Sequence, residues 1–130
     1  MDFDIPNAMS FDLDKMYCGA ISRGDVVICE ADGKEKVMVV LQDNILNDEL
    51  STVVCAPIES VKKGEETLIN EVMLKSSEAG LDSDGICMPH KVVTISKKIC
   101  IEKKSNIGKE KVNEIFRALD ITLGRFRDGS

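Results

Sequence analysis

The sequence predicts a mainly β fold, a small curled sheet or barrel closed by one C-terminal α-helix. Three observations indicate it: six or seven short apolar runs, tight-turn signals between them, and a helical period confined to the end of the chain. At 130 residues, 43% of them hydrophobic and 31% charged, the chain has room for one globular domain. We expect an acidic arm over residues 1–20, the domain over 21–124 and a frayed tail over 125–130.

The first two strands are expected at Val26–Glu30 and Lys36–Leu41. Asp32-Gly33 between them is typical of a two-residue hairpin, because both turn positions need a positive φ. Further strands are expected at Thr52–Ile58, Leu68–Leu74, Ile86–Met88, Val92–Ile95 and Ile99–Ile101, with loops at 43–48, 62–66 and 80–85.

The last element has a different period. Apolar residues recur there at spacings of three and four, which is one face of a helix: Val112, Ile115, Phe116, Leu119 and Leu123. Ser105 or Asn106 can cap the start of this helix, and Gly124 suits its end.

The net charge of −6 is unevenly distributed. Residues 1–50 carry a net charge of −7 and residues 51–130 a net charge of +1, with a run of lysines over residues 88–111. Patches rather than totals steer a polyanion, so this run is compatible with nucleic-acid binding, and equally with a solvated face.

The five cysteines form an odd set without a C-x-x-C pair, and four of them sit in β-like apolar runs. This pattern favours reduced thiols packed as small hydrophobes in a cytoplasmic protein. Cys87 and His90 have C-x-x-H spacing, but two ligands do not fill a zinc shell, so we expect neither metal nor cofactor. The sequence shows no secretory signal and no apolar stretch of membrane-spanning length.

Several sequence motifs, in the same order along the chain, resemble those of the MazF/PemK family of toxin endoribonucleases. They are Arg23–Val27 (R-G-D-V-V), Val37–Asn44 (V-M-V-V-L-Q-D-N), Thr52–Ile58 (T-V-V-C-A-P-I), Gly80–Ile86, Val93–Lys97 and the helix Val112–Leu123. The resemblance covers about residues 22–124. It implies an SH3-like barrel of the MazF/PemK/CcdB type that works as a homodimer. It also implies metal-independent cutting of single-stranded RNA, and silencing by an antitoxin peptide laid across the cleavage groove.

The resemblance also places the site. The family's arginine at the start of the second strand falls on Lys36, its hydroxyl falls on Glu59 with Ser60 next to it, and its later acid falls on His90. RNA cleavage needs a base, a cation for the phosphorane and an acid for the leaving oxygen, and these side chains suffice chemically. The predicted catalytic residues are therefore Lys36, Glu59, Ser60 and His90, and the predicted RNA-binding residues are Arg23, Lys62, Lys63 and Lys91.

A second interpretation stays open. Lysine lacks the planar fork with which arginine grips two phosphate oxygens, and the short Asp32-Gly33 hairpin omits the longer Gly-rich loop of the family. A lone histidine is also often structural. These departures are typical of a barrel that has lost its nuclease and binds nucleic acid or a protein partner, as related barrels that poison DNA gyrase do. The acidic arm adds the hypothesis that it docks on the basic cleft.

Overall fold

The computed structural model describes residues 16–61 and 66–125. Its strands are β1 (Asp25–Ala31), β2 (Lys34–Val40), β3 (Thr52–Ser60), β4 (Val72–Leu74), β5 (Gly85–Cys87), β6 (Val93–Ser96) and β7 (Cys100–Asn106). Its α-helices are α1 (Asn44–Glu49), α2 (Ser76–Ala79) and α3 (Gly108–Leu123), with 3₁₀ turns η2 (Pro89–Lys91) and η3 (Lys97–Ile99). Most of the predicted arm, and the tail beyond Arg125, lie outside the described residues.

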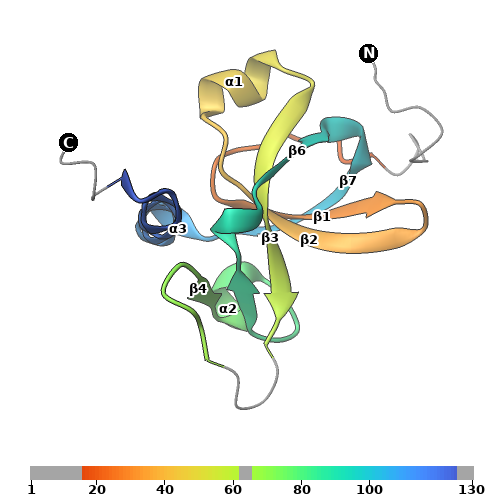
Figure 1. Ribbon diagram of the computed structural model, residues 1–130. Helices are drawn as coiled ribbons and strands as arrows, with labels where there is room; N and C mark the ends of the chain where they lie inside the picture. Colours follow the sequence, from red (N-terminus) through yellow and green to blue (C-terminus); the bar gives the residue numbers. More distant parts are fainter. Residues whose placement is uncertain (1–15, 62–65, 126–130) are drawn as a thin grey trace.

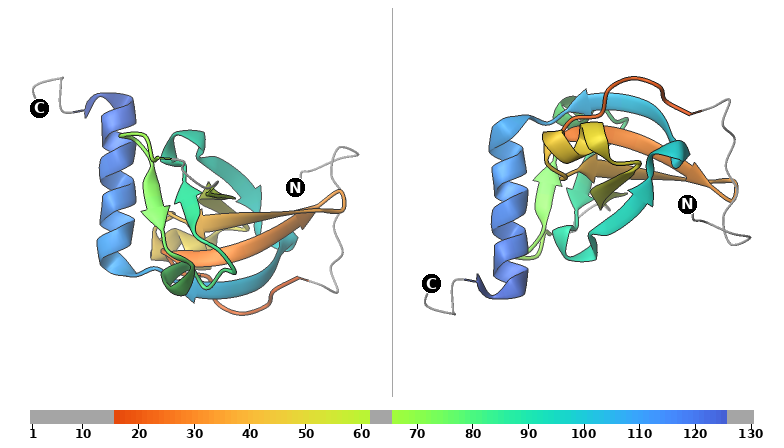
Figure 2. Two further views of the ribbon diagram at one scale, coloured as in Figure 1. Left: turned by 90° about the horizontal axis from the view of Figure 1, so that it is seen from below. Right: turned by 90° about the horizontal axis from the view of Figure 1, so that it is seen from above.

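The strands form one antiparallel sheet in the order β4-β5-β3-β2-β1-β7, and β6 pairs separately with β3. The sheet is strongly curved, and α3 lies against one side of it (Figures 1 and 2). This confirms the predicted class, a mainly β fold with a C-terminal helix. Among the described strands the pairing path ends at β4 and β7, so the sheet is open and does not close into a ring.

Strand β3 changes partner along its length. Its first half pairs with β6 from Thr52 to Cys55, and its last residues pair with β5 from Ile58 to Ser60. Pro57, which has no N–H to donate, lies between the two halves, and its carbonyl accepts a hydrogen bond of 3.0 Å from the Met88 N–H. One edge of β3 therefore pairs with β6 and then with β5. Because η2 lies in the chain between these two strands, it is held close to the middle of the sheet.

The predicted hairpin is confirmed. Asp32 and Gly33 both adopt positive φ, 54° and 75°, and the register runs from Ala31 opposite Lys34 to Val26 opposite Val39. No loop longer than these two residues separates β1 from β2. The wall that a longer loop would add beside Lys36 is absent from this hairpin.

Two apolar clusters fill the two faces of the sheet. Neighbouring residues of one strand divide between them, as Val26 and Val27 do, because successive side chains point to opposite faces. One cluster packs the sheet against α3, whose Val112, Ile115 and Ala118 are buried. The other gathers Cys29, Cys55 and Cys100 with Met38 and neighbouring aliphatic residues. Cys87 is buried in the first cluster, so all four strand cysteines are core residues, as predicted.

The two ends of α3 differ in how well they were predicted. Gly124 closes the helix in the left-handed conformation, as expected, but the N-cap position is Ile107, whose side chain makes no cap. Asn106, one residue earlier, accepts a hydrogen bond of 2.8 Å at its Oδ1 from the Gly108 N–H, and the Ser105 hydroxyl donates to the Glu78 carbonyl instead. The expected apolar face is only partly correct, because Leu123 is 62% exposed at the last turn. No helix in the described residues is long and apolar enough to cross a membrane.

Three sequence expectations are wrong. The loop expected over residues 43–48 contains α1, whose first turn is capped by the Asp43 carboxylate accepting from the Ile45 N–H. The strand expected at Leu68–Leu74 is reduced to β4, because Leu68 and Ile69 point into solvent. The strand expected at Ile99–Ile101 continues to Asn106, since β7 pairs with β1 along its whole exposed, lysine-rich half.

Candidate active site

Lys36 and Glu59 lie on adjacent strands, near the turn of the β1–β2 hairpin. The register of β2 and β3 pairs Met38 with Pro57 and ends with Val37 opposite Ile58, and Lys36 and Glu59 are the next residues of the two strands. Directly opposed side chains of an antiparallel pair share one face of the sheet. Both side chains are exposed, so each is free to meet a ligand from solvent.

These two residues line a common pocket of about 500 Å³. Its wall is completed by Lys91 from η2 and by apolar atoms of β2, β3 and β6; the full lining is Glu35, Lys36, Val37, Met38, Pro57, Ile58, Glu59, Lys91 and Val93. Residues from three separate parts of the chain thus meet at one hollow. We call it the Lys36 pocket.

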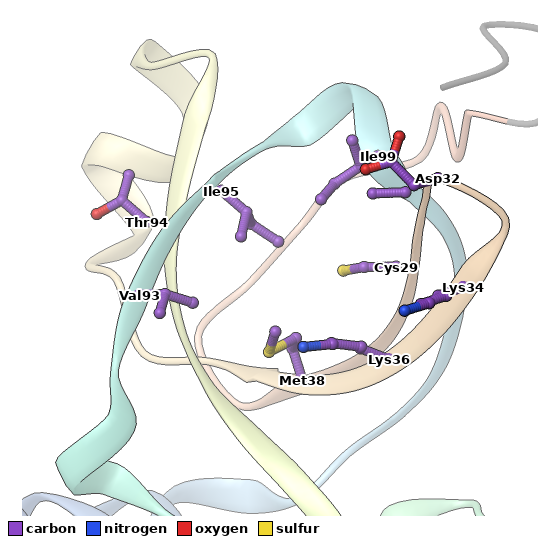
Figure 3. A pocket seen from close by; sticks show the side chains of 10 residues that line it. Cys29, Asp32, Lys34, Lys36, Met38, Val93, Thr94, Ile95 and Ile99 are labelled. Carbon is purple, nitrogen blue, oxygen red and sulfur yellow. The ribbon is translucent and has the colours of Figure 1, made fainter. Parts of the chain in front are cut away.

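A second pocket of about 480 Å³ adjoins it and shares Lys36, Met38 and Val93. Figure 3 shows its lining, with Lys34 and Lys36 on the hairpin side and Ile95 and Ile99 across from them. The Cys29 side chain projects from β1 into this space. We call it the Cys29 pocket. The two pockets are therefore neighbours along the face that the hairpin and β6 share.

The two pockets carry mixed charge. Lys34, Lys36 and Lys91 are interleaved with the carboxylates of Asp32, Glu35 and Glu59. An anion here is therefore attracted by individual ammonium groups rather than by a broad positive surface. The nearby carboxylates supply acceptors for protons or hydroxyl groups.

The lysine run over residues 88–111 does not form one basic face. The Lys103 Nζ lies 3.4 Å from the buried Asp25 carboxylate, and Lys111 lies between Glu78 and Glu114. The Lys97 ammonium donates to the backbone carbonyl of Asn47. These lysines tie elements together, and of the whole run only Lys91 lines either pocket.

Two predicted catalytic residues lie outside the pocket linings. His90 is exposed in η2 beside Lys91, but it lines neither pocket. Ser60 pairs with Gly85 at the end of β3 and points to the opposite face from Glu59. The structure brings together Lys36, Glu59 and Lys91 and leaves these two at the margin. Lys62 and Lys63 lie outside the described residues.

Arg23 is engaged elsewhere in the molecule. Its Nε donates a hydrogen bond of 2.9 Å to the Leu41 carbonyl, and its guanidinium lies 5.0 Å from the centre of the Phe116 ring on α3. It borders a smaller hollow at the start of α3 and neither of the pockets beside Lys36. The structure therefore does not bring Arg23 to the other predicted site residues.

The motifs that carry the family resemblance hold the fold. The Asp25 carboxylate is fully buried and accepts from the Ser22 N–H at 2.7 Å and from the Asn106 amide at 3.0 Å. Gln42 and Asn47 are likewise buried and exchange hydrogen bonds of 3.0 and 2.9 Å. Polar groups so deeply buried need such partners, so these motif residues stabilise the fold.

Sequence reasoning missed the other residues of the hollow. Lys34 and Glu35 line the pockets together with the apolar wall of Met38 and Val93. A signal was present, because Lys34 and Lys36 are two residues apart in one strand and therefore share a face of β2. In the described residues no group of three or more His, Cys, Asp or Glu is arranged to hold a metal ion.

The chain therefore forms a small curved antiparallel sheet with a C-terminal helix and a pocket lined by lysines and carboxylates. The family model described as "PemK-like, MazF-like toxin of type II toxin-antitoxin system" matches residues 22–123, and the chain belongs to this family. The resemblance inferred from its motifs is thereby confirmed.

Individual relatives and solved structures also belong to this group of toxins. The endoribonuclease MazF of Staphylococcus epidermidis is 28% identical over 112 residues, which cover 80% of this chain and 92% of the relative. An endoribonuclease from Mycobacterial species, solved with its cognate antitoxin, superposes with a TM-score of 0.69 at 22% identity, over 81% of this chain and 96% of its own. MazE-MazF (Form-II) from Deinococcus radiodurans gives 0.66 at 19% identity, over 82% and 97%. At these identities, the two solved structures show a shared fold.

Proposed function

We propose that this chain is a metal-independent endoribonuclease that cuts single-stranded RNA at the Lys36 pocket. The observation that carries the proposal is the meeting of Lys36, Glu59 and Lys91 around one hollow, from β2, β3 and η2. Curated relatives are named endoribonucleases, and this supports the same reaction class here. Lys36 stands where the family has an arginine, so a point charge takes the place of a bidentate fork.

In the proposed reaction the 2′-hydroxyl oxygen attacks the adjacent phosphorus, and the bond from phosphorus to the 5′-oxygen breaks. Glu59 accepts the 2′-hydroxyl proton, and the Lys36 ammonium stabilises the charge that builds up on the phosphorane oxygens. Lys91 holds the phosphate of a neighbouring nucleotide. The products are a 2′,3′-cyclic phosphate and a 5′-hydroxyl end.

A proton must also reach the leaving 5′-oxygen. His90 is the candidate donor, because it adjoins Lys91 in an exposed 3₁₀ turn and an imidazole ring can donate a proton from its N–H. Its place outside the pocket lining requires the bound RNA strand to extend over η2. Ser60, predicted to be catalytic, and Arg23, predicted to bind RNA, line neither pocket, so the proposal depends less on them.

The test is cleavage of a long single-stranded RNA in the presence of EDTA, comparing wild type with Lys36→Ala, Lys36→Arg and Glu59→Gln. We expect Lys36→Ala to lower kcat about 10²–10³-fold, as loss of one transition-state donor does. Lys36→Arg retains the charge and should retain cleavage. Glu59→Gln removes the base and should lower kcat about 10²-fold or more.

Lys104→Ala is the matched control. Lys104 is an exposed lysine on β7 that pairs with Glu102 and lines neither pocket, so its loss should leave cleavage unchanged. If all these variants cut RNA like wild type, the site is elsewhere. If wild type binds RNA but does not cut it in EDTA or in Mg²⁺, the second function applies, a non-catalytic nucleic-acid-binding fold, which the lysine at the arginine position favours.

We further propose a homodimer, regulated by an antitoxin peptide and acting in the cytoplasm. The apolar side chains of Ile45 and Leu46 on α1 and of Leu50 at its C-cap are exposed, with exposed fractions of 73%, 45% and 43%. Such a cluster on a short helix is typical of an interface. Light scattering on wild type and on Ile45→Asp tests the dimer. The solved relatives with antitoxin bound support the second partner.

A further inference from the structure

Lys36, Cys29 and Cys100 lie in one row across three neighbouring strands. Cys29 on β1 is the register partner of Lys36 on β2 and of Cys100 on β7. Partners in an antiparallel ladder point to the same face of the sheet, so the two thiols meet beside the lysine. Their Sγ atoms lie 3.8 Å apart and share a hydrogen bond in which either sulfur can donate.

The backbone already has the spacing that a disulfide needs. Directly opposed residues of an antiparallel pair have Cα atoms roughly 4.5–5.5 Å apart, and disulfides span Cα separations of roughly 4.4–6.8 Å. Small rotations of the two side chains would therefore bring the sulfurs into bonding contact without moving the strands. Cys87 lies in the other core cluster, and the Cys55 thiol donates to its own strand at the Val53 carbonyl.

One of the two sulfurs is within reach of small molecules. Cys29 is only 3% exposed, but its side chain projects into the Cys29 pocket, which opens beside Lys34 and Lys36 (Figure 3). Cys100 is buried next to it. The hydrogen bond from Cys29 and the positive charge of Lys97 lower the pKa of Cys100, whereas the same hydrogen bond and burial raise the pKa of Cys29. The pair therefore holds a thiolate more readily than an isolated buried cysteine such as Cys87, whose pKa burial raises to about 12.

We propose that Cys29 and Cys100 are a redox modification site, which a small hydroperoxide entering the Cys29 pocket oxidises to a disulfide. The Cys29 sulfur, which borders the pocket, passes its proton across the shared hydrogen bond to the Cys100 thiolate and attacks the terminal peroxide oxygen. The O–O bond breaks, a sulfenic acid forms on Cys29, and the departing alkoxide, or hydroxide from hydrogen peroxide, takes a proton from solvent and leaves as the alcohol or as water. The second thiol then attacks the sulfenic sulfur, the S–O bond breaks, and water leaves with the remaining proton. Two thiols lose two electrons, and the hydroperoxide gains them.

The bond would have two consequences for the fold. It would link β1 to β7 across 71 residues of chain, and this raises the stability of the folded state by restricting the unfolded chain. It would also turn the Cys29 sulfur away from the pocket that borders Lys36. An effect on RNA cleavage rests on the proposed function, whereas the cross-link does not depend on it.

The experiment uses the folded full chain carrying Cys18→Ser, since Cys18 is the exposed cysteine of the described residues. The protein is treated with hydrogen peroxide, quenched, unfolded, alkylated and weighed. We expect loss of two hydrogen atoms, and two alkylated thiols where the untreated protein has four. Trypsin separates all the cysteines, so the product should be residues 24–34 linked to residues 99–103, and dithiothreitol should release the two peptides.

Cys55→Ala is the matched control, because Cys55 is a buried cysteine of the same core cluster, and it should leave the cross-link intact. Cys29→Ser and Cys100→Ser should each abolish it. The wild-type chain supplies the reference, since its exposed Cys18 reports that the oxidant was active. Four alkylated thiols after a dose that oxidises Cys18 would overturn the proposal. So would a cross-link to Cys55 or Cys87, or one that forms only in the unfolded chain.

Discussion

Replacing Asp25 with alanine tests how much the buried aspartate of the R-G-D motif contributes to the free energy of unfolding. The carboxylate is fully buried and faces three donors: the Ser22 N–H at 2.7 Å, the Asn106 amide at 3.0 Å and the Lys103 ammonium at 3.4 Å. These donors come from the segment just before β1, from the last residue of β7 and from its middle. Asp25→Ala removes the acceptor for all three while leaving the backbone of β1 unchanged.

The expected loss of stability depends on whether each donor has another acceptor once the carboxylate is removed. Hydrogen bonds to a charged group contribute about 1.5–3 kcal/mol each. Lys103 is 35% exposed and can turn to water, so its contribution is small, and Asn106 keeps its bond to the Arg23 carbonyl. The Ser22 N–H loses its carboxylate acceptor. We therefore expect Asp25→Ala to lower the free energy of unfolding by about 2–4 kcal/mol, and Asp25→Asn to lower it by less.

Urea unfolding followed by far-UV circular dichroism measures this loss, because the chain has no tryptophan to report by fluorescence. Glu102→Ala is the matched control, since Glu102 is also a carboxylate beside a β7 lysine but is 54% exposed. Its loss should cost about 0.5 kcal/mol or less. Equal urea midpoints for the two variants would refute the reasoning, because burial of the Asp25 carboxylate would then carry no energetic weight.

Two other predictions concern pH and the acidic arm. Burial raises the pKa of Cys87 from an ordinary 9.0 to about 12, so the folded state keeps a proton that the unfolded chain loses. Stability should therefore fall as pH rises from 9.0 toward 12, by at most about 1.4 kcal/mol per unit, and urea midpoints of Cys87→Ala should fall less steeply. Removing residues 1–15 changes the formal net charge from −6 to −3 and should tighten RNA binding several-fold at low salt, an effect that disappears at high salt. Fluorescence anisotropy with labelled RNA measures the affinity. The full chain with Asp2, Asp4, Asp12 and Asp14 each replaced by asparagine separates the effect of charge from that of length. Equal RNA affinity of the truncated and full chains at low and at high salt would contradict the prediction.

The candidate site was only partly readable from the sequence. The resemblance pointed to Lys36 and Glu59, and the lysine at position 91 was chosen as a neighbour of His90; the fold brings these three around one pocket. It leaves His90 and Ser60 outside the lining, because a residue one step along a strand or turn faces another direction. Lys34 and Met38 share a face of β2 with Lys36 by simple alternation, but the sequence does not show that this face borders a hollow, and they were not recognised.

What the sequence determined by itself is the structure that depends on neighbours a few residues apart. Asp32-Gly33 alone specifies a two-residue turn, because few residues tolerate a positive φ. The spacing of Val112 and Ile115 and the ends at Asn106 and Gly124 define α3 in the same local way. The short apolar runs with tight turns between them likewise predict the mainly β class from local sequence.

What only the tertiary structure decided is which distant segments meet. The six-residue helix α1 is too short to be stable by itself, and it is held by Gln42 and by Lys97 from fifty positions further on. The partner change of β3 at Pro57 brings η2 beside Lys36, and the pairing of β1 with β7 sets Cys29 against Cys100. These contacts depend on burial of side chains on both faces of the curved sheet, a property of the assembled strands that no local stretch of sequence contains.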